Sequence, residues 1–146
     1  MIFNQKAFTL PEVLIIVVII SILVSLTLPL GLDFYRSQQL ETHTQGIIQT
    51  LRRAQLKAMS SETDSSFGVY LTNENYTLFQ GDSYNTRSAQ FDEVFYLPAV
   101  LTLSGLSEIV FSKSEGEPNV AGDIILKSDS ETRTININEM GRINLQ

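Results

Sequence analysis

The hydrophobic positions of this 146-residue chain follow three patterns in turn. The first is a 20-residue run at positions 13–32, VLIIVVIISILVSLTLPLGL, which contains no charged side chain. In helical geometry a run of this length extends ~30 Å, the thickness of the hydrocarbon core of a bilayer. The first pattern therefore predicts a helix that is able to cross a membrane.

The second pattern is a periodic apolar stripe that follows this run. Its members have the i, i+4, i+7, i+11 spacing of one helix face. They are Ile47, Leu51, Ala54 and Ala58, widened by Ile48 and Met59. The spacing predicts an amphipathic helix that continues the membrane helix, as a rod of ~80 Å from about Phe8 to Ser60. A polar cluster at residues 60–64 ends the helical pattern.

The third pattern, beyond residue 65, is the alternation of β-strands. A hairpin is expected around the polar turn at residues 73–75, and a second turn at residues 139–142. The expected strands are 67–71, 76–80, 94–96, 109–111, 123–127, 134–138 and 143–145, with a loop at 81–89. We therefore predict an α+β fold, in which the long N-terminal helix packs on a small antiparallel β-sheet or sandwich head.

Charge divides the chain into two parts. Residues 1–60 carry five basic and three acidic side chains, whereas residues 61–146 carry five basic and thirteen acidic ones, within a net charge of −6. The acidic part has no electrostatic footprint for nucleic acid. Because the chain has no cysteine, disulfides, thiolate metal sites and a catalytic cysteine are excluded.

The apolar run has two simple interpretations, a secretory signal peptide or a plain membrane anchor. A signal peptide has a shorter apolar region of ~7 to 15 residues and a small-x-small cleavage pattern after it, and this sequence has neither feature. The anchor interpretation leaves Glu12 unexplained, since a carboxylate beside hydrocarbon costs free energy unless it has a partner.

The segment AFTLPE at residues 7–12, followed by the aliphatic run, resembles the processing signal of type IV prepilins and pseudopilins. The resemblance implies that a prepilin peptidase cuts between Ala7 and Phe8 and then methylates the new amine of Phe8. Glu12, the fifth residue of the mature chain, would pair with that amine on a neighbouring subunit. Ala7 replaces the more common Gly, and Pro11 replaces the more frequent Ile or Leu, although proline is tolerated in a first helical turn.

Pro29 lies near the end of the apolar run, where pilins commonly carry a helix-kinking proline. A proline inside a helix removes one backbone hydrogen bond and costs ~3 kcal/mol in isolation. With Gly31 close by, we expect a kink there and local melting of the helix when the subunit packs into a filament. The alternative is a helix that ends at the membrane surface.

The C-terminal half carries a second resemblance. Residues 111–119 (FSKSEGEPN), 121–124, 135–137 and the Gly141-Arg142 turn are similar to the head of GspH/FimT-type minor pilins, and most similar to the ComGD type of competence machinery. The resemblance implies a minor pilin or pseudopilin of a type IV filament-like machine, with a competence pilus for DNA uptake favoured. The alternatives are a GspH-like pseudopilin of a type II secretion system and a membrane-anchored binding module that does not polymerise.

The residue inventory does not favour an enzyme, a cofactor or a metal. His43, the single histidine, is expected at a solvated helix position. Asp123, Asp129 and Glu131 have no recognised calcium-loop spacing and are expected to be a solvated acidic surface. No glycine-rich phosphate loop or nucleophile elbow is present.

Direct DNA binding is not expected either. The cations Arg52, Arg53 and Lys57 cluster on a helix that a filament would bury, and the head has few others. These are Arg87, Lys113, Lys127, Arg133 and Arg142.

The predicted organisation has four parts, a leader at 1–7, an assembly helix at 8–32, an amphipathic helix at 33–61 and a β-rich head at 62–146. The resemblance implies four kinds of partner, namely the prepilin peptidase, other pilins, an inner-membrane assembly platform and, before assembly, lipid. It also implies a single-pass protein of the cytoplasmic membrane, with its head outside the cytoplasm, that is later incorporated in a pilus or pseudopilus.

Overall fold

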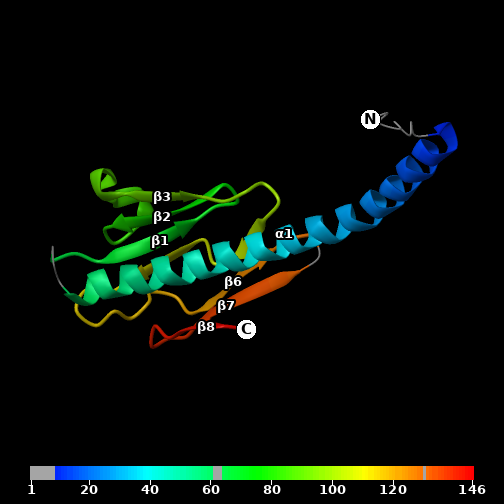
Figure 1. Cartoon of the computed structure of the whole chain (residues 1–146). Coiled ribbons are helices and arrows are strands. Elements are labelled where there is room, and N and C mark those ends of the chain that lie inside the picture. Colours follow the sequence, from blue (N-terminus) through cyan, green and yellow to red (C-terminus); the bar gives the residue numbers. More distant parts are fainter. Residues whose placement is uncertain (1–8, 61–63, 130) are drawn as a thin grey trace, which may run out of the picture. The chain divides into compact units, whose positions relative to one another are not determined.

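The computed structural model describes residues 9–60, 64–129 and 131–146, and it leaves the side chains of residues 26–33 undescribed. The described residues form one α-helix, eight β-strands and two short 3₁₀ helices (Figure 1). The chain divides into two compact units, Met1–Tyr35 and Arg36–Gln146. The helix α1, at Leu10–Ser60, contributes to both units.

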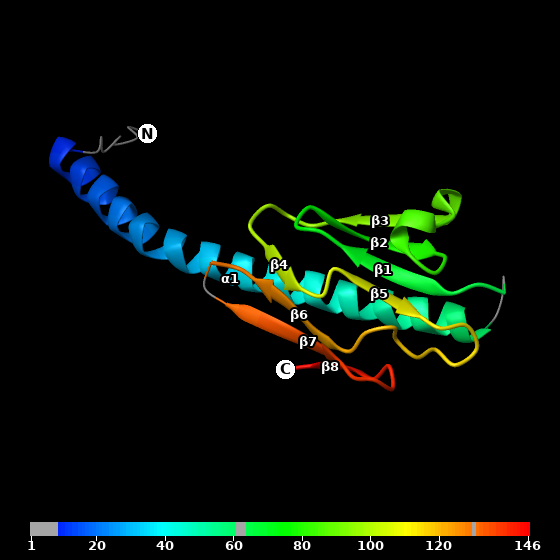
Figure 2. The ribbon, with the colours of Figure 1, turned by 180° about the vertical axis from the view of Figure 1, so that it is seen from behind.

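The second unit contains all the strands. The first sheet has the order β3-β2-β1-β5 and the second has the order β4-β6-β7-β8, with antiparallel pairing throughout. The first sheet consists of β1 (Phe67–Leu71), β2 (Asn75–Gln80), β3 (Glu93–Tyr96) and β5 (Glu108–Phe111). The second consists of β4 (Thr102–Gly105), β6 (Gly122–Lys127), β7 (Thr132–Ile137) and β8 (Ile143–Leu145). The amphipathic half of α1 runs along both sheets (Figures 1 and 2).

The predicted hairpin is confirmed, because β1 pairs with β2 from Phe67 opposite Gln80 to Leu71 opposite Tyr76. Its turn is closed by Thr72, whose side-chain oxygen accepts hydrogen bonds from the backbone N–H groups of Glu74 and Asn75. The C-terminal hairpin is confirmed by the pairing of β7 with β8. The predicted α+β class is therefore confirmed, with two sheets in the head.

Two features of the second unit differ from the sequence expectation. The strand β4 was not expected, because it contains one large apolar residue, Leu103, and is defined by its pairing with β6. The segment expected as a loop, at residues 81–89, contains one 3₁₀ helix, η1 at Tyr84–Thr86, and a second, η2 at Ala89–Phe91, begins at its last residue. The ring of Tyr84 stacks on Tyr70 at 4.0 Å and meets Phe79 edge-on at 5.6 Å. Aromatic packing thus holds this segment against the sheet.

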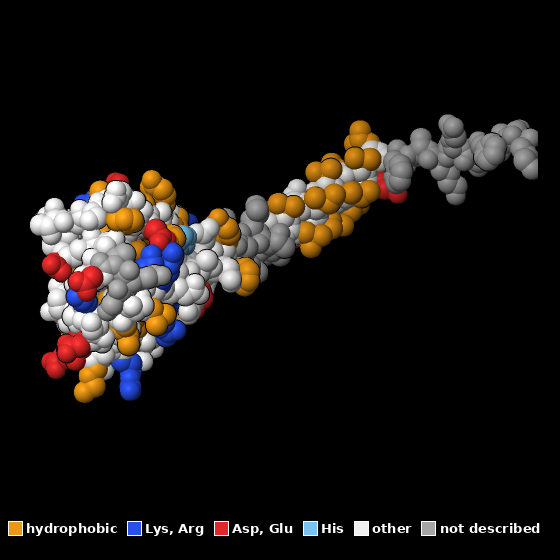
Figure 3. Space-filling view, turned by 90° about the vertical axis from the view of Figure 1, so that its left-hand side faces the viewer, with side chains coloured by type: hydrophobic (Ala, Val, Ile, Leu, Met, Phe, Trp, Pro, Cys, Tyr) orange, Lys and Arg blue, Asp and Glu red, His pale blue; other side chains and the backbone are white. Residues whose placement is uncertain are grey.

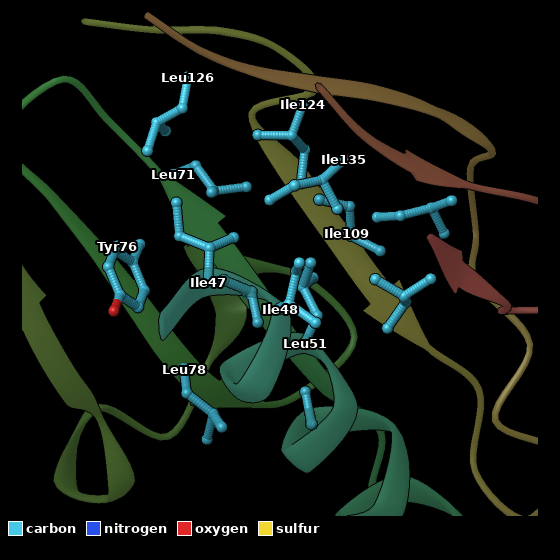
Figure 4. Packing of buried hydrophobic residues seen from close by; sticks show 14 of the residues in the cluster. Ile47, Ile48, Leu51, Leu71, Tyr76, Leu78, Ile109, Ile124, Leu126 and Ile135 are labelled. Atoms are coloured by element: carbon cyan, nitrogen blue, oxygen red, sulfur yellow. The ribbon is translucent and has the colours of Figure 1, made fainter. Parts of the chain in front are cut away.

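The apolar stripe of α1 forms the centre of the core. Ile47, Leu51, Ala54 and Ala58 are fully buried, together with Ile48. Figure 4 shows Ile47, Ile48 and Leu51 among Leu71 and Ile109 of the first sheet and Ile124 and Ile135 of the second. Met59 was predicted to widen the stripe, and this was wrong, since its side chain is 48% exposed at the last turn of the helix.

Candidate functional site

The start of α1 carries the sequence-predicted assembly residue. The Thr9 carbonyl oxygen accepts hydrogen bonds from the backbone N–H groups of Glu12, at 3.1 Å, and Val13, at 3.2 Å, and these bonds begin the helix. Pro11 lies in this first turn, where its missing N–H costs no helical hydrogen bond. Glu12 is exposed, in a turn where the helix dipole favours negative charge. Its carboxylate forms no ion pair within the described part of the chain.

The other predicted site residues lie wholly or partly outside the described part of the chain. Ala7 and Phe8 are outside the described residues. The helical assignment of α1 continues through Pro29 and Gly31, but their side chains are not described. Cleavage, methylation and the helix kink therefore remain predictions.

The described large apolar side chains of the first unit are exposed. From Val13 to Val24 every large hydrophobic residue is between 44% and 58% exposed, and such side chains cover the face of this helix seen in Figure 3. Within the described residues, no helix has both the length and the apolar character that a membrane crossing requires. The predicted run includes residues 26–32, which lie outside that description.

The three acidic residues considered for a cation do not meet. Asp123 accepts a hydrogen bond from Asn136 at 2.7 Å, and Asp129 forms an ion pair with Arg36 at 3.2 Å. Glu131 forms an ion pair with Arg133 at 3.1 Å and accepts a hydrogen bond from the Ser37 hydroxyl. Among the described residues, no group of three or more potential ligands is placed to hold a metal ion.

The cations predicted to cluster on the helix are mostly neutralised. Arg53 donates to both oxygens of Glu93, at 2.6 and 2.8 Å, and Lys57 contacts the same carboxylate at 3.2 Å. Arg52 is exposed. Three cations of the head also form ion pairs. Arg87 pairs with Asp92, Lys113 pairs with Asp64, and Arg133 pairs with both Glu41 and Glu131. Lys127 and Arg142 are exposed and enter no ion pair within the described residues.

His43 was expected at a solvated position, and the structure places it half-buried beside the core face of α1. Burial lowers the pKa of His43 below its ordinary value of 6.5, because the charged ring loses hydration. Nearby, the hydrogen bond from Gln45 is the main cause that lowers the pKa of Glu41, and Arg133 adds to it.

Gln55 was not singled out from the sequence. Its side chain joins the loop at residues 111–119 to the turn at Gly141-Arg142. Its side-chain amide donates to the backbone carbonyls of Gly116, at 2.9 Å, and Gly141, at 3.1 Å. Both glycines have left-handed φ, +68° and +73°, and are buried. A side chain on Gly116 would meet Met59 Cγ at 2.6 Å, and one on Gly141 would meet the Gly116 oxygen at 2.8 Å. The signal available in the sequence was the position of Gln55 on the same helix face as Leu51 and Ala58.

Comparison with known proteins gives two matches. Residues 2–28 match the prokaryotic N-terminal methylation motif. The fold is similar to the structure of the minor pseudopilin EpsH from the type 2 secretion system of Vibrio cholerae, with a TM-score of 0.58 and 18% identity over 74% of this chain and 96% of that one. Comparison with curated proteins gives no match. The chain thus combines a prokaryotic N-terminal methylation motif with a pilin-like α+β fold.

Proposed function

We propose that this chain is a minor pilin or pseudopilin, a structural subunit and not an enzyme, that joins a type IV filament-like machine. The observation that carries the proposal is the methylation motif at residues 2–28, which overlaps the start of a helix whose described large apolar side chains from Val13 to Val24 are exposed. The precursor is held in the inner membrane by this helix. Assembly then replaces the lipid around the helix with neighbouring subunits.

The N-terminal residues have distinct roles in this proposal. The prepilin peptidase cuts between Ala7 and Phe8 and methylates the amine of Phe8. Glu12 of one subunit then neutralises the methylated amine of its neighbour, because both charges would otherwise be stranded in a medium of low dielectric constant. The exposed Glu12 carboxylate, with no ion pair in the described part of its own chain, supports this role. A bend at Pro29 and Gly31 accommodates the helix in the filament.

The machine itself has two candidates. The fold similarity to EpsH, which covers 96% of that chain, supports a GspH-like pseudopilin of a type II secretion system better than a competence minor pilin. The competence candidate rests on the resemblance of residues 111–119 and the Gly141-Arg142 turn. Deleting the gene distinguishes them: loss of protein secretion with normal transformation supports the secretion system, and the reverse result supports the competence pilus.

If the machine takes up DNA, we propose that this subunit acts indirectly. Six cations in the described part of the chain are already paired with carboxylates, namely Arg36, Arg53, Lys57, Arg87, Lys113 and Arg133. The full chain in detergent is expected to show no saturable binding of duplex DNA at physiological salt. Binding with a dissociation constant of about 1 μM or tighter, at or beyond the tight end of the non-specific range, would contradict an indirect role.

Cross-linking in the host membrane tests the assembly role of Glu12. The chain has no cysteine, so Val17→Cys, at a position 56% exposed, can carry a photoreactive cross-linker. During assembly the probe is expected to capture other subunits of the filament. Adding Glu12→Ala should leave membrane insertion intact and remove most of this capture, whereas Glu139→Ala, at an exposed acid of the head, should change nothing. Equal capture with and without the Glu12 carboxylate would refute the assigned role.

A further inference from the structure

We infer that Phe34 and Tyr35 form an aromatic anchor that holds the precursor at the non-cytoplasmic lipid–water boundary of the membrane. The inference rests on the proposed function, because it requires the apolar helix to be inserted in a bilayer. The aromatic anchor is a second surface for contact with the membrane, and the interfacial region of the lipid is its partner.

The exposure of the two rings is the first observation. Phe34 is 72% exposed and Tyr35 is 60% exposed. In the second unit Phe67, Phe79 and Phe111 are buried, whereas Tyr96 is exposed as well. Consecutive helix positions are ~100° apart around the axis, so the two rings point in different directions. This arrangement suits a surrounding boundary layer better than a groove on a single partner.

The position of the rings along the helix is the second observation. From Glu12 to Phe34 the helix rises ~33 Å, slightly more than the ~30 Å hydrocarbon core of a bilayer. When Glu12 lies at the cytoplasmic boundary, the aromatic anchor lies at the opposite one. The charged residues Asp33 and Arg36 flank the two aromatic residues in the sequence. The polar part of the chain therefore begins at the level of the aromatic anchor. Phe is apolar and Tyr combines an apolar ring with a hydroxyl, and aromatic residues with a polar group are enriched at these boundaries.

The described part of the helix between the two ends, up to Ser25, is suited to lipid on every side. Its large apolar residues from Val13 to Val24 are all about equally exposed, so no face is set apart for a partner. The two described hydroxyls in this stretch are satisfied within the helix, since Ser21 donates to the Val17 carbonyl at 2.7 Å and Ser25 donates to the Ile22 carbonyl at 2.9 Å. A polar group that is bonded internally avoids most of the cost of entering hydrocarbon.

A single-tryptophan experiment measures the depth of the anchor. The chain has no tryptophan, so Phe34→Trp in the full chain gives one probe. The protein is reconstituted in phosphatidylcholine–phosphatidylglycerol vesicles that contain lipids brominated either near the headgroup or near the end of the acyl chain. We expect the headgroup-proximal bromines to quench this probe several-fold more strongly than the deep bromines. Equal or stronger quenching by the deep bromines would overturn the inference.

Two matched probes separate this inference from the proposed function. Ile19→Trp, in the middle of the apolar run, should be quenched best by the deep bromines, and Tyr96→Trp, on an exposed position of the head, should be quenched by neither. If Ile19→Trp is deep but Phe34→Trp behaves like Tyr96→Trp, the aromatic anchor is wrong and insertion stands. If Ile19→Trp is not quenched at all, the helix is not inserted, and the proposed function fails as well. Shielding of Phe34→Trp from both lipids and aqueous quenchers would indicate packing against protein, which also overturns the anchor.

A second measurement tests whether the rings fix the depth. In the Ile19→Trp background, Phe34→Ala with Tyr35→Ala should change the ratio of shallow to deep quenching by about twofold or more, because the helix adjusts its tilt and depth when an interfacial anchor is lost. Phe91→Ala removes another exposed aromatic side chain, 49% exposed, from the head and should leave the ratio unchanged. An unchanged ratio in the anchor variant would contradict the role of Phe34 and Tyr35.

Discussion

The two halves of α1 have the same secondary structure and opposite burial. In the half up to Tyr35, the described large apolar side chains are between 44% and 80% exposed. In the half from Arg36 onward, Leu40, Ile47 and Leu51 have no exposed surface. The difference follows from the pattern of hydrophobic residues rather than from their number. An apolar stripe one face wide is buried by one side of a domain, whereas a helix that is apolar all round needs a surrounding medium.

This comparison assigns different consequences to mutations in the two halves. A substitution on the buried stripe removes contacts within the folded unit, so it changes the free energy of unfolding. A substitution at an exposed apolar residue of the first half changes a side chain that is available to lipid or to other subunits, so we expect it to change insertion or assembly instead.

Leu51→Ala should reduce the free energy of unfolding of the second unit by about 2 to 5 kcal/mol, because it leaves a cavity where a fully buried leucine contacted both sheets. Ile19→Ala, in the exposed half, should leave that free energy unchanged within about 0.5 kcal/mol. Denaturant unfolding of the full chain in detergent, followed by the tyrosine signal, measures both values. A similar loss of unfolding free energy in the two variants would contradict the proposed difference between the buried and the exposed half of α1.

Gln55→Ala should reduce the free energy of unfolding by about 1 to 3 kcal/mol, because two buried loop carbonyls lose their donor. The matched control is Gln49→Ala, on the exposed face of the same helix, which should stay within about 0.5 kcal/mol of the unmodified chain. Amide hydrogen exchange would localise the effect, with faster exchange expected at Gly116 and Gly141. Unchanged exchange at both glycines would show that Gln55 does not hold these loops.

The smallest expected effect concerns acid stability. The pKa of His43 is lower in the folded chain than its ordinary value of 6.5, so the unfolded chain binds the proton more readily. This contribution to stability is present above the ordinary pKa and is lost as the pH falls through the folded pKa. His43→Gln should therefore lose less stability between about pH 7.5 and pH 5.5 than the unmodified chain does. Thr42→Gln, at the exposed neighbouring position, should keep the original pH dependence, and an identical pH dependence in all three proteins would contradict the prediction.

The sequence predicts most of the fold because the second unit has strong local periodicity. The stripe from Ile47 to Ala58 specifies one helix and its buried face, and the alternation in β7 specifies one strand and its buried face. The short apolar runs of β1 and β2 specify strands that are buried along nearly their whole length. The strand β4 has no such pattern, and its existence depends on pairing with β6, which is distant in sequence. Tyr84 likewise depends on Tyr70 and Phe79 across the sheet. Elements that are defined by such long-range contacts leave little local signal.

In the candidate site, too, the sequence predicts the residues whose signal is local and does not predict those that depend on long-range contacts. The motif at the N-terminus is local, so the sequence suffices to identify it, and residues 2–28 match the methylation motif. Gln55 acts through two loops that lie 61 and 86 residues further along the chain, and no spacing rule connects them. The half-buried state of His43 was also missed, since its burial depends on how the helix packs on the head.

The N-terminus of the mature protein tests the central claim most directly. Mass spectrometry of the chain, purified from a host with an active prepilin peptidase, should show a protein that lacks residues 1–7 and carries one added methyl group on Phe8. Ala7→Gly should give the same product, because glycine is the more common residue before the cut in this class of signal. An intact chain that begins at Met1, without methylation, would contradict the account.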